Sequence, residues 1–173
     1  RQDGGLFLYG DDAERLIMRP KEVYDGAMPS ANSAAALNFL RLSVLAERTD
    51  LAEFAQKLFD AFTPEVSLSP CSHAFFLSAL LFYNSNPSVV IIAADEETEE
   101  VRKMLQILRK SRDPFVCSIL FTGRHRELAG VIPSVSEYRP IGGRPAAYIC
   151  RDFACQPPIT DIAEFEKVFS YMD

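Results

Sequence analysis

Apolar residues recur at helical spacing through the first half of the chain. Residues 33–47 place leucine and valine side chains on one face, which predicts a first helix. Residues 50–63 carry apolar side chains at i, i+3, i+4 and i+7, and Pro64 is expected to end this second helix. A third helix is predicted over residues 69–83. Because this third segment is apolar nearly all round, we expect it to be buried on more than one side.

The period of the pattern changes in the second half of the chain. Residues 89–94 form a continuous run rich in β-branched side chains, typical of a parallel strand that is covered on both faces. A helix over 97–110 and a second buried strand over 115–121 complete a right-handed βαβ unit. Residues 146–150 predict a third strand, and the apolar spacing in 161–172 predicts a final helix.

The first residues show a different pattern. Two short apolar-polar runs, 6–9 and 15–19, flank Gly10-Asp11-Asp12 and predict a β-hairpin. The predicted fold class is therefore α/β. A hairpin and a three-helix segment occupy residues 1–86, and a small three-stranded, mainly parallel sheet with flanking helices occupies residues 87–173.

The composition and net charge limit the class of protein and the kinds of partner that we expect. The chain has 173 residues, 48% of them hydrophobic and 13 of them Phe, which indicates a folded protein with a substantial core. A net charge of -6 argues against nucleic acid or an anionic membrane surface as a partner. No apolar run is long enough to span a bilayer, and no secretory leader is recognisable. The cysteine usage suits a reducing compartment, so we expect a cytoplasmic protein. Because the chain begins at Arg1, we expect it to be a piece of a longer protein.

Polar side chains are concentrated in residues 24–33, where the extended N-terminal segment gives way to the first helix. Asp25-Gly26 permits a tight turn, and Ser30, Asn32 and Ser33 are all good N-cap residues. One cap is enough for one helix, so polar groups are left over beside a carboxylate. Two interpretations stay open: an over-supplied turn and cap, or a pocket at a helix N-terminus for an anionic or hydroxyl-rich ligand.

Four cysteines, Cys71, Cys117, Cys150 and Cys155, form neither a CxxC motif nor a zinc-binding pattern, and we predict no metal site and no cofactor. Cys71 and Cys117 fall in helix and strand patterns and are expected in the core. In one extended strand, the Cα atoms of Cys150 and Cys155 would lie roughly 16 Å apart, too far for a disulfide. A tight turn at residues 152–153 would bring them together, so a reduced pair and a disulfide both stay open.

Two long segments carry a resemblance to a known family. They read RPKEVYDGAMPSANS over residues 19–33 and AYICRDFACQPPITD over residues 147–161. Together they resemble the C-terminal end of the thioredoxin-domain proteins related to bacterial YyaL and to the spermatogenesis-associated, thioredoxin-like proteins. The resemblance implies a full-length protein with a thioredoxin-like domain, an α/α toroid and a small C-terminal α/β portion. The toroid that the resemblance implies is of the six-hairpin glycosidase type and similar to N-acylglucosamine 2-epimerases. This chain would hold the last toroid helices and the α/β portion.

The resemblance to toroid epimerases implies a carbohydrate- or metabolite-processing enzyme as the first functional hypothesis. By that analogy Asp25 would serve as general base, Ser30 and Asn32 would orient sugar hydroxyls, and Tyr24 would stack against the ligand. Toroid epimerases generally rely on His, and no His lies near this stretch in the sequence. The expected ligand is carbohydrate-like.

Two alternatives belong to other functional classes. In a redox-linked protein, Cys150 and Cys155 would exchange with the thioredoxin-like domain that the resemblance supplies. In a non-catalytic structural or assembly domain, the apolar helix over residues 69–83 would pack on the rest of the full-length protein or on a second copy, giving a homo-oligomer. The sequence does not decide whether the chain is an enzyme.

Overall fold

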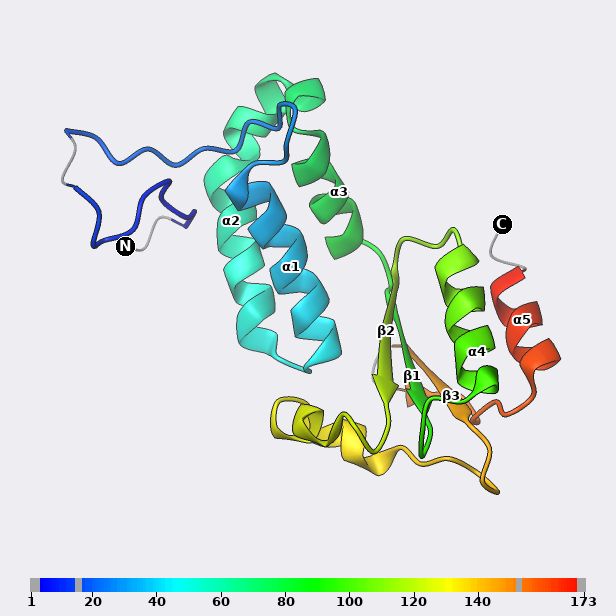
Figure 1. Cartoon of the computed structure of the whole chain (residues 1–173). Coiled ribbons are helices and arrows are strands. Elements are labelled where there is room, and N and C mark those ends of the chain that lie inside the picture. The colour runs from blue at the N-terminus through cyan, green and yellow to red at the C-terminus, as the bar shows by residue number, and fades with distance from the viewer. Residues whose placement is uncertain (1–3, 15–16, 152–153, 171–173) are drawn as a thin grey trace. The chain divides into compact units, whose positions relative to one another are not determined.

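The computed structural model of the chain describes residues 4–14, 17–151 and 154–170 (Figure 1). The chain divides into two compact units. Residues 1–43 and 47–85 form the first unit, and residues 44–46 and 86–173 form the second.

Helices make up the first unit, and phenylalanine rings fill its core. Its elements are α1 (Ala31–Leu45), α2 (Thr49–Leu68), the short 3-10 helix η1 (Pro70–Ser72) and α3 (Ala74–Tyr83). Phe76 of α3 is completely buried, and its ring meets those of Phe59 and Phe62 of α2 edge-on at centroid distances of 5.4 and 6.3 Å. These contacts join α3 to the apolar stripe of α2.

Pro64 lies inside α2, so the prediction that it ends the helix is wrong. Proline lacks the N–H that would bond to the carbonyl of residue 60, and one ladder bond is lost. The helix continues nevertheless because its apolar stripe continues, with Val66 buried one half-turn beyond the proline. Thr63 also donates its hydroxyl to the Phe59 carbonyl at 2.6 Å. Burial of the last turn outweighs the missing bond.

The predicted N-terminal hairpin is not formed in the described residues of this segment, which contain no strand. Among the described residues, the backbone hydrogen bond between the two sides runs from Leu8 N–H to the carbonyl of Pro20, just past the second run, at 3.0 Å. Leu8, Ile17 and Met18 are exposed, so the alternating pattern buries no common face that would hold two strands together. Residues 15–16, part of the second predicted run, lie outside the described residues.

A mixed sheet of four strands forms the centre of the second unit. In chain order the strands are β1 (Ser88–Ala93), β2 (Val116–Phe121), β3 (Ala146–Arg151) and β4 (Ala154–Cys155). The spatial order is β2-β1-β3-β4, in which β1 and β2 are parallel and the other two pairs are antiparallel. The α/β class is confirmed, but the sheet is mixed and has a fourth strand. Short 3-10 helices connect β2 to β3, whereas a parallel return needs a long crossover, usually a full helix.

Different layers cover the two faces of this sheet (Figure 1). One face carries α4 (Glu99–Lys110) and α5 (Ile162–Ser170), and the other carries the 3-10 helices η2 (Arg126–Gly130) and η3 (Pro133–Glu137). Val90 and Ile92 of β1 pack with Met104 and Phe165 on the helical face. Ile91 points the opposite way, toward Val135 of η3. Both faces of β1 are therefore buried, as its uninterrupted apolar run predicts.

Among the described residues, no helix combines the length and the apolar character that crossing a bilayer requires.

Candidate functional site

Asp25 joins the N-terminal segment to the start of α3. Its Oδ2 accepts hydrogen bonds from the backbone N–H groups of Phe75 and Phe76, at 2.9 and 3.0 Å. Its Oδ1 accepts from the Ser30 N–H at 2.8 Å, and its own N–H donates to the Ser72 carbonyl at 2.9 Å. Free N–H groups at a helix start favour a carboxylate, so Asp25 caps α3 from 50 residues away.

The other polar residues of the same stretch are also bonded within the protein. Ser30 accepts the Ser33 N–H at 3.0 Å, and the two buried hydroxyls bond to each other at 2.8 Å. Asn32 is only 2% exposed. Its Oδ1 accepts the Leu6 N–H at 2.6 Å, and its Nδ2 donates to the carbonyls of Leu6 and Glu22 at 3.0 and 2.7 Å. Ser30 caps α1, and Asn32 fastens the N-terminal segment to it.

Tyr24 differs from these neighbours because its side chain is 55% exposed. Its ring meets the imidazole of His73 edge-on at a centroid distance of 6.5 Å. His73, which lies between η1 and α3, is buried. Sequence reasoning missed this histidine because 49 positions, from 24 to 73, separate it from Tyr24, and no spacing rule links the two. The fold brings a His to the stretch that has none nearby in the sequence.

The imidazole of His73 is bonded on one side only. Nδ1 lies 2.8 Å from the Ser69 carbonyl, which can only accept, so Nδ1 carries the proton. Nε2 is buried and has no hydrogen-bond partner among the described residues, and a carboxylate oxygen of the exposed Glu65 lies 3.8 Å away. A neutral His73 therefore holds an unpaired lone pair inside the first unit.

The structure thus brings together Tyr24, Asp25, Ser30 and Asn32, but in two different situations. The polar atoms of Asp25, Ser30 and Asn32 bond to the protein's own backbone and hydroxyls. Tyr24 presents an exposed ring. A catalytic role for Asp25 and ligand-binding roles for the others stay predictions.

Cys150 and Cys155 form a disulfide. They lie opposite each other in the antiparallel pair of β3 and β4, with their Cα atoms 4.0 Å apart. The next pair along, Ile149 and Gln156, is joined by a backbone hydrogen bond of 2.9 Å. The cysteines therefore occupy a non-hydrogen-bonded position, where facing side chains approach most closely. The turn predicted at residues 152–153 lies outside the described residues.

The two sulfur atoms differ in their surroundings. Cys155 is exposed on β4, the edge strand, whereas Cys150 is half-buried on the face of β3 that packs against η2 and η3. The hydroxyl oxygen of Tyr138 lies 3.4 Å from Cys155 Sγ and 3.6 Å from Cys150 Sγ. Cys71 and Cys117 are in no disulfide among the described residues: Cys117 is buried as predicted, but Cys71 is exposed, because η1 holds it outside the helix in which it was expected.

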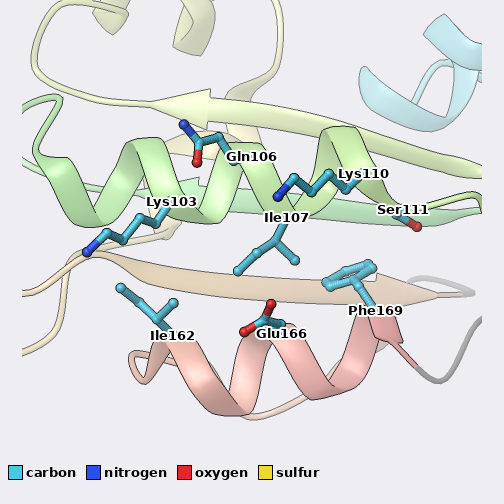
Figure 2. Close-up of a pocket in the computed structure, with 8 residues that line it drawn as sticks. All are labelled: Lys103, Gln106, Ile107, Lys110, Ser111, Ile162, Glu166 and Phe169. Atoms are coloured by element: carbon cyan, nitrogen blue, oxygen red, sulfur yellow. The ribbon is translucent and has the colours of Figure 1, made fainter.

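A hollow of about 370 Å³ lies between α4 and α5 (Figure 2). Ile107, Ile162 and Phe169 form its apolar part, and the exposed side chains of Lys103 and Lys110 stand at its rim. None of the residues predicted for a site lines it. Within the described part of the chain, no group of three or more His, Cys, Asp or Glu side chains is placed to hold a metal ion.

The chain is similar to proteins that are several times longer. It is 30% identical over 171 residues to human "Spermatogenesis-associated protein 20", a match that covers 96% of this chain and 22% of that protein. The mouse protein of the same name is 29% identical over 154 residues, covering 88% of this chain and 20% of that protein. "Uncharacterized protein B0495.5" of Caenorhabditis elegans is 26% identical over 168 residues, covering 96% and 22%.

The chain therefore spans about a fifth of the length of these curated relatives. No protein-family model matches it. Similarity over nearly the whole chain confirms the resemblance that residues 19–33 and 147–161 carry. Over most of its own length, the chain is therefore similar to proteins named spermatogenesis-associated protein 20.

Proposed function

We propose that Cys150 and Cys155 form a redox-active pair that exchanges with a protein dithiol. The observation that carries the proposal is the disulfide across the last two strands of the sheet, with one sulfur-bearing residue exposed at the edge. An exchanging disulfide must be reachable by an attacking thiolate. Cys155 meets this requirement on β4.

The position of the disulfide in the sheet supports exchange over a purely structural role. The bond closes a loop of only five positions, and short loops gain least from cross-linking. β3 is already held by its five-residue ladder with β1, so opening the bond leaves the core of the second unit in place. The pair can therefore cycle between disulfide and dithiol while the fold persists.

The expected cytoplasmic location strengthens this proposal. Disulfides of cytosolic proteins are usually transient and serve catalysis or redox sensing. The thioredoxin-like domain that the family resemblance implies is a suitable dithiol partner in the full-length protein. Exchange with that domain would make this chain the acceptor or the donor of two electrons.

Thiol counting tests the redox pair. In oxidised, denatured protein, iodoacetamide should label two cysteines, Cys71 and Cys117, and after dithiothreitol treatment it should label all four. The circular dichroism of the folded protein should be the same in both states, because only β4 depends on the bond. Labelling of all four thiols after exposure to a disulfide oxidant, or loss of the sheet upon reduction, would contradict the proposal. A Cys155→Ser variant, which cannot form the bond, is the control.

The carbohydrate-processing alternative has one observation in its favour, the unpaired Nε2 of His73 beside the exposed ring of Tyr24. Against it, Asp25 accepts three hydrogen bonds from the backbone. Nε2 is also fully covered, so a ligand would reach it only after neighbouring side chains move. Binding of a sugar to the unaltered protein but not to His73→Gln, measured by titration calorimetry, would favour this alternative.

An assembly role draws on α3, where Leu81 and Tyr83 are exposed while Phe76 and Phe82 are buried. If these exposed residues pack on a second copy, the chain sediments as a dimer, and Leu81→Ser shifts it toward monomer. Sedimentation velocity at several concentrations measures this directly. If the chain is a monomer at all concentrations, self-association through α3 is excluded. The rest of the longer protein is then the remaining candidate partner for this helix.

A further inference from the structure

The hydroxyl of Tyr138 lies beside both sulfurs of the disulfide, at 3.4 and 3.6 Å. Tyr138 directly follows η3, and its ring packs against that of Tyr148 with a centroid distance of 4.8 Å and an interplanar angle of 60°. Tyr148 is in turn fixed on β3 and donates its hydroxyl to the Arg139 carbonyl at 2.8 Å. The phenol is therefore held beside the sulfurs by contacts with the sheet.

Exposure makes the two sulfurs unequal toward an incoming thiolate. Cys155 is exposed at the sheet edge, and Cys150 is half-buried. Attack at Cys155 Sγ displaces Cys150 Sγ as a thiolate, inside the layer that Tyr138 shares with η3. The negative charge would then develop on Cys150 Sγ, where solvent is partly excluded. A hydrogen-bond donor from the protein is needed there to stabilise the charge.

We propose that Tyr138 is a catalytic residue that donates a hydrogen bond to the Cys150 thiolate during exchange with a protein dithiol. This inference rests on the proposed redox function and deepens it, because it assigns Cys155 as the attacked sulfur and Cys150 as the leaving sulfur. A tyrosine hydroxyl is less acidic than a thiol, so Tyr138 keeps its proton and stabilises the charge by hydrogen bonding.

The exchange balances in two steps. A thiolate of the dithiol attacks Cys155 Sγ, a mixed disulfide forms, the Cys150–Cys155 bond breaks, and Cys150 leaves as a thiolate bonded to Tyr138. The second thiolate of the partner then attacks the partner's own sulfur in the mixed disulfide and releases Cys155. The partner is oxidised to its disulfide, and this chain gains two electrons, with two protons taken up from water.

The test compares Tyr138→Phe with Tyr148→Phe in a Cys71→Ser background. Both variants keep the aromatic pair and remove one hydroxyl, but only Tyr138 reaches the sulfurs in the described contacts. Reduction of the Cys150–Cys155 disulfide by dithiothreitol at neutral pH should be on the order of tenfold slower in Tyr138→Phe, because the hydrogen bond to the leaving Cys150 thiolate is lost. The Tyr148→Phe protein keeps the ring that packs against Tyr138, so its reaction should slow far less than that of Tyr138→Phe.

A second measurement begins with a protein that retains Tyr138, so its first result does not depend on how well Tyr138→Phe folds. In a Cys155→Ser protein that retains Tyr138, the rate of Cys150 alkylation against pH gives the thiol pKa. We expect it below the ordinary value of about 8.5. Adding Tyr138→Phe should raise this pKa by about one unit. Trapping of the unaltered protein with glutathione should place the mixed disulfide on Cys155, as peptide mass spectrometry would show.

The outcomes separate the two proposals. If the disulfide never forms, the redox function itself fails. If it forms and exchanges, but Tyr138→Phe and Tyr148→Phe behave alike or the mixed disulfide lies on Cys150, only the role of Tyr138 is overturned. A Cys150 pKa at or above the ordinary value with Tyr138 present would also overturn it.

Discussion

Replacing Asp25 with Ala should destabilise the first unit by about 3 kcal/mol, because three backbone N–H groups lose a charged acceptor. Asp25→Asn should also destabilise, by about 2 kcal/mol. Its amide keeps one oxygen for α3, but its NH2 group turns toward the Ser30 N–H, which needs an acceptor. Urea unfolding followed by circular dichroism at 222 nm measures the loss. Hydrogen exchange at the amides of Phe75 and Phe76 shows whether it arises at α3.

Asp60→Ala is the matched control for this prediction. Asp60 is an exposed carboxylate on α2 that accepts a hydrogen bond from Gln56 in the same helix. Its removal should change stability by less than about 0.5 kcal/mol. If Asp25 acted only as a general base, the result would be the opposite. Asp25→Asn would then abolish turnover by the full-length protein but leave the free energy of unfolding in urea unchanged. That pattern would refute the capping role and support the catalytic prediction.

Elements with a local cause could be predicted from the sequence. The run 89–94 predicts a strand that the structure places at Ser88–Ala93, because β-branched residues buried on both faces leave few alternatives. The predicted helix over 97–110 matches α4, at Glu99–Lys110, because acidic residues begin it and basic residues end it. Here the pattern, the dipole and the packing all favour the same structure.

Features that depend on distant partners could not be predicted. Residues 24–33 hold more polar groups than one helix cap needs, and their partners include Phe75 and Phe76, about 50 positions along the chain. His73 approaches Tyr24 only through the packing of α3. The pairing of Cys150 with Cys155 depends on β4, which has only two residues and no pattern of its own. The surplus of potential N-cap residues in this stretch therefore reflects hydrogen bonds to residues far along the chain.

Asn32→Ala should destabilise the first unit by about 2–3 kcal/mol, because it leaves the Leu6 N–H and the carbonyls of Leu6 and Glu22 without their partner. Asn38→Ala is the matched control, since Asn38 is exposed on the same helix. It should change stability by less than about 0.5 kcal/mol. Urea unfolding compares the two variants, and hydrogen exchange at the Leu6 amide reports release of the N-terminal segment.

Asn32→Asp distinguishes an anchor from a ligand-binding amide more sharply, because it keeps the shape and changes only the donor. One carboxylate oxygen still accepts the Leu6 N–H, but the other faces the carbonyls of Leu6 and Glu22, which cannot donate. We therefore expect Asn32→Asp to be at least as unstable as Asn32→Ala at neutral pH. Protonation of the new carboxyl in acid should recover part of the loss, because the acid form can donate to one carbonyl. Stability equal to the unaltered protein at pH 7 would show that Asn32 does not hold the N-terminal segment.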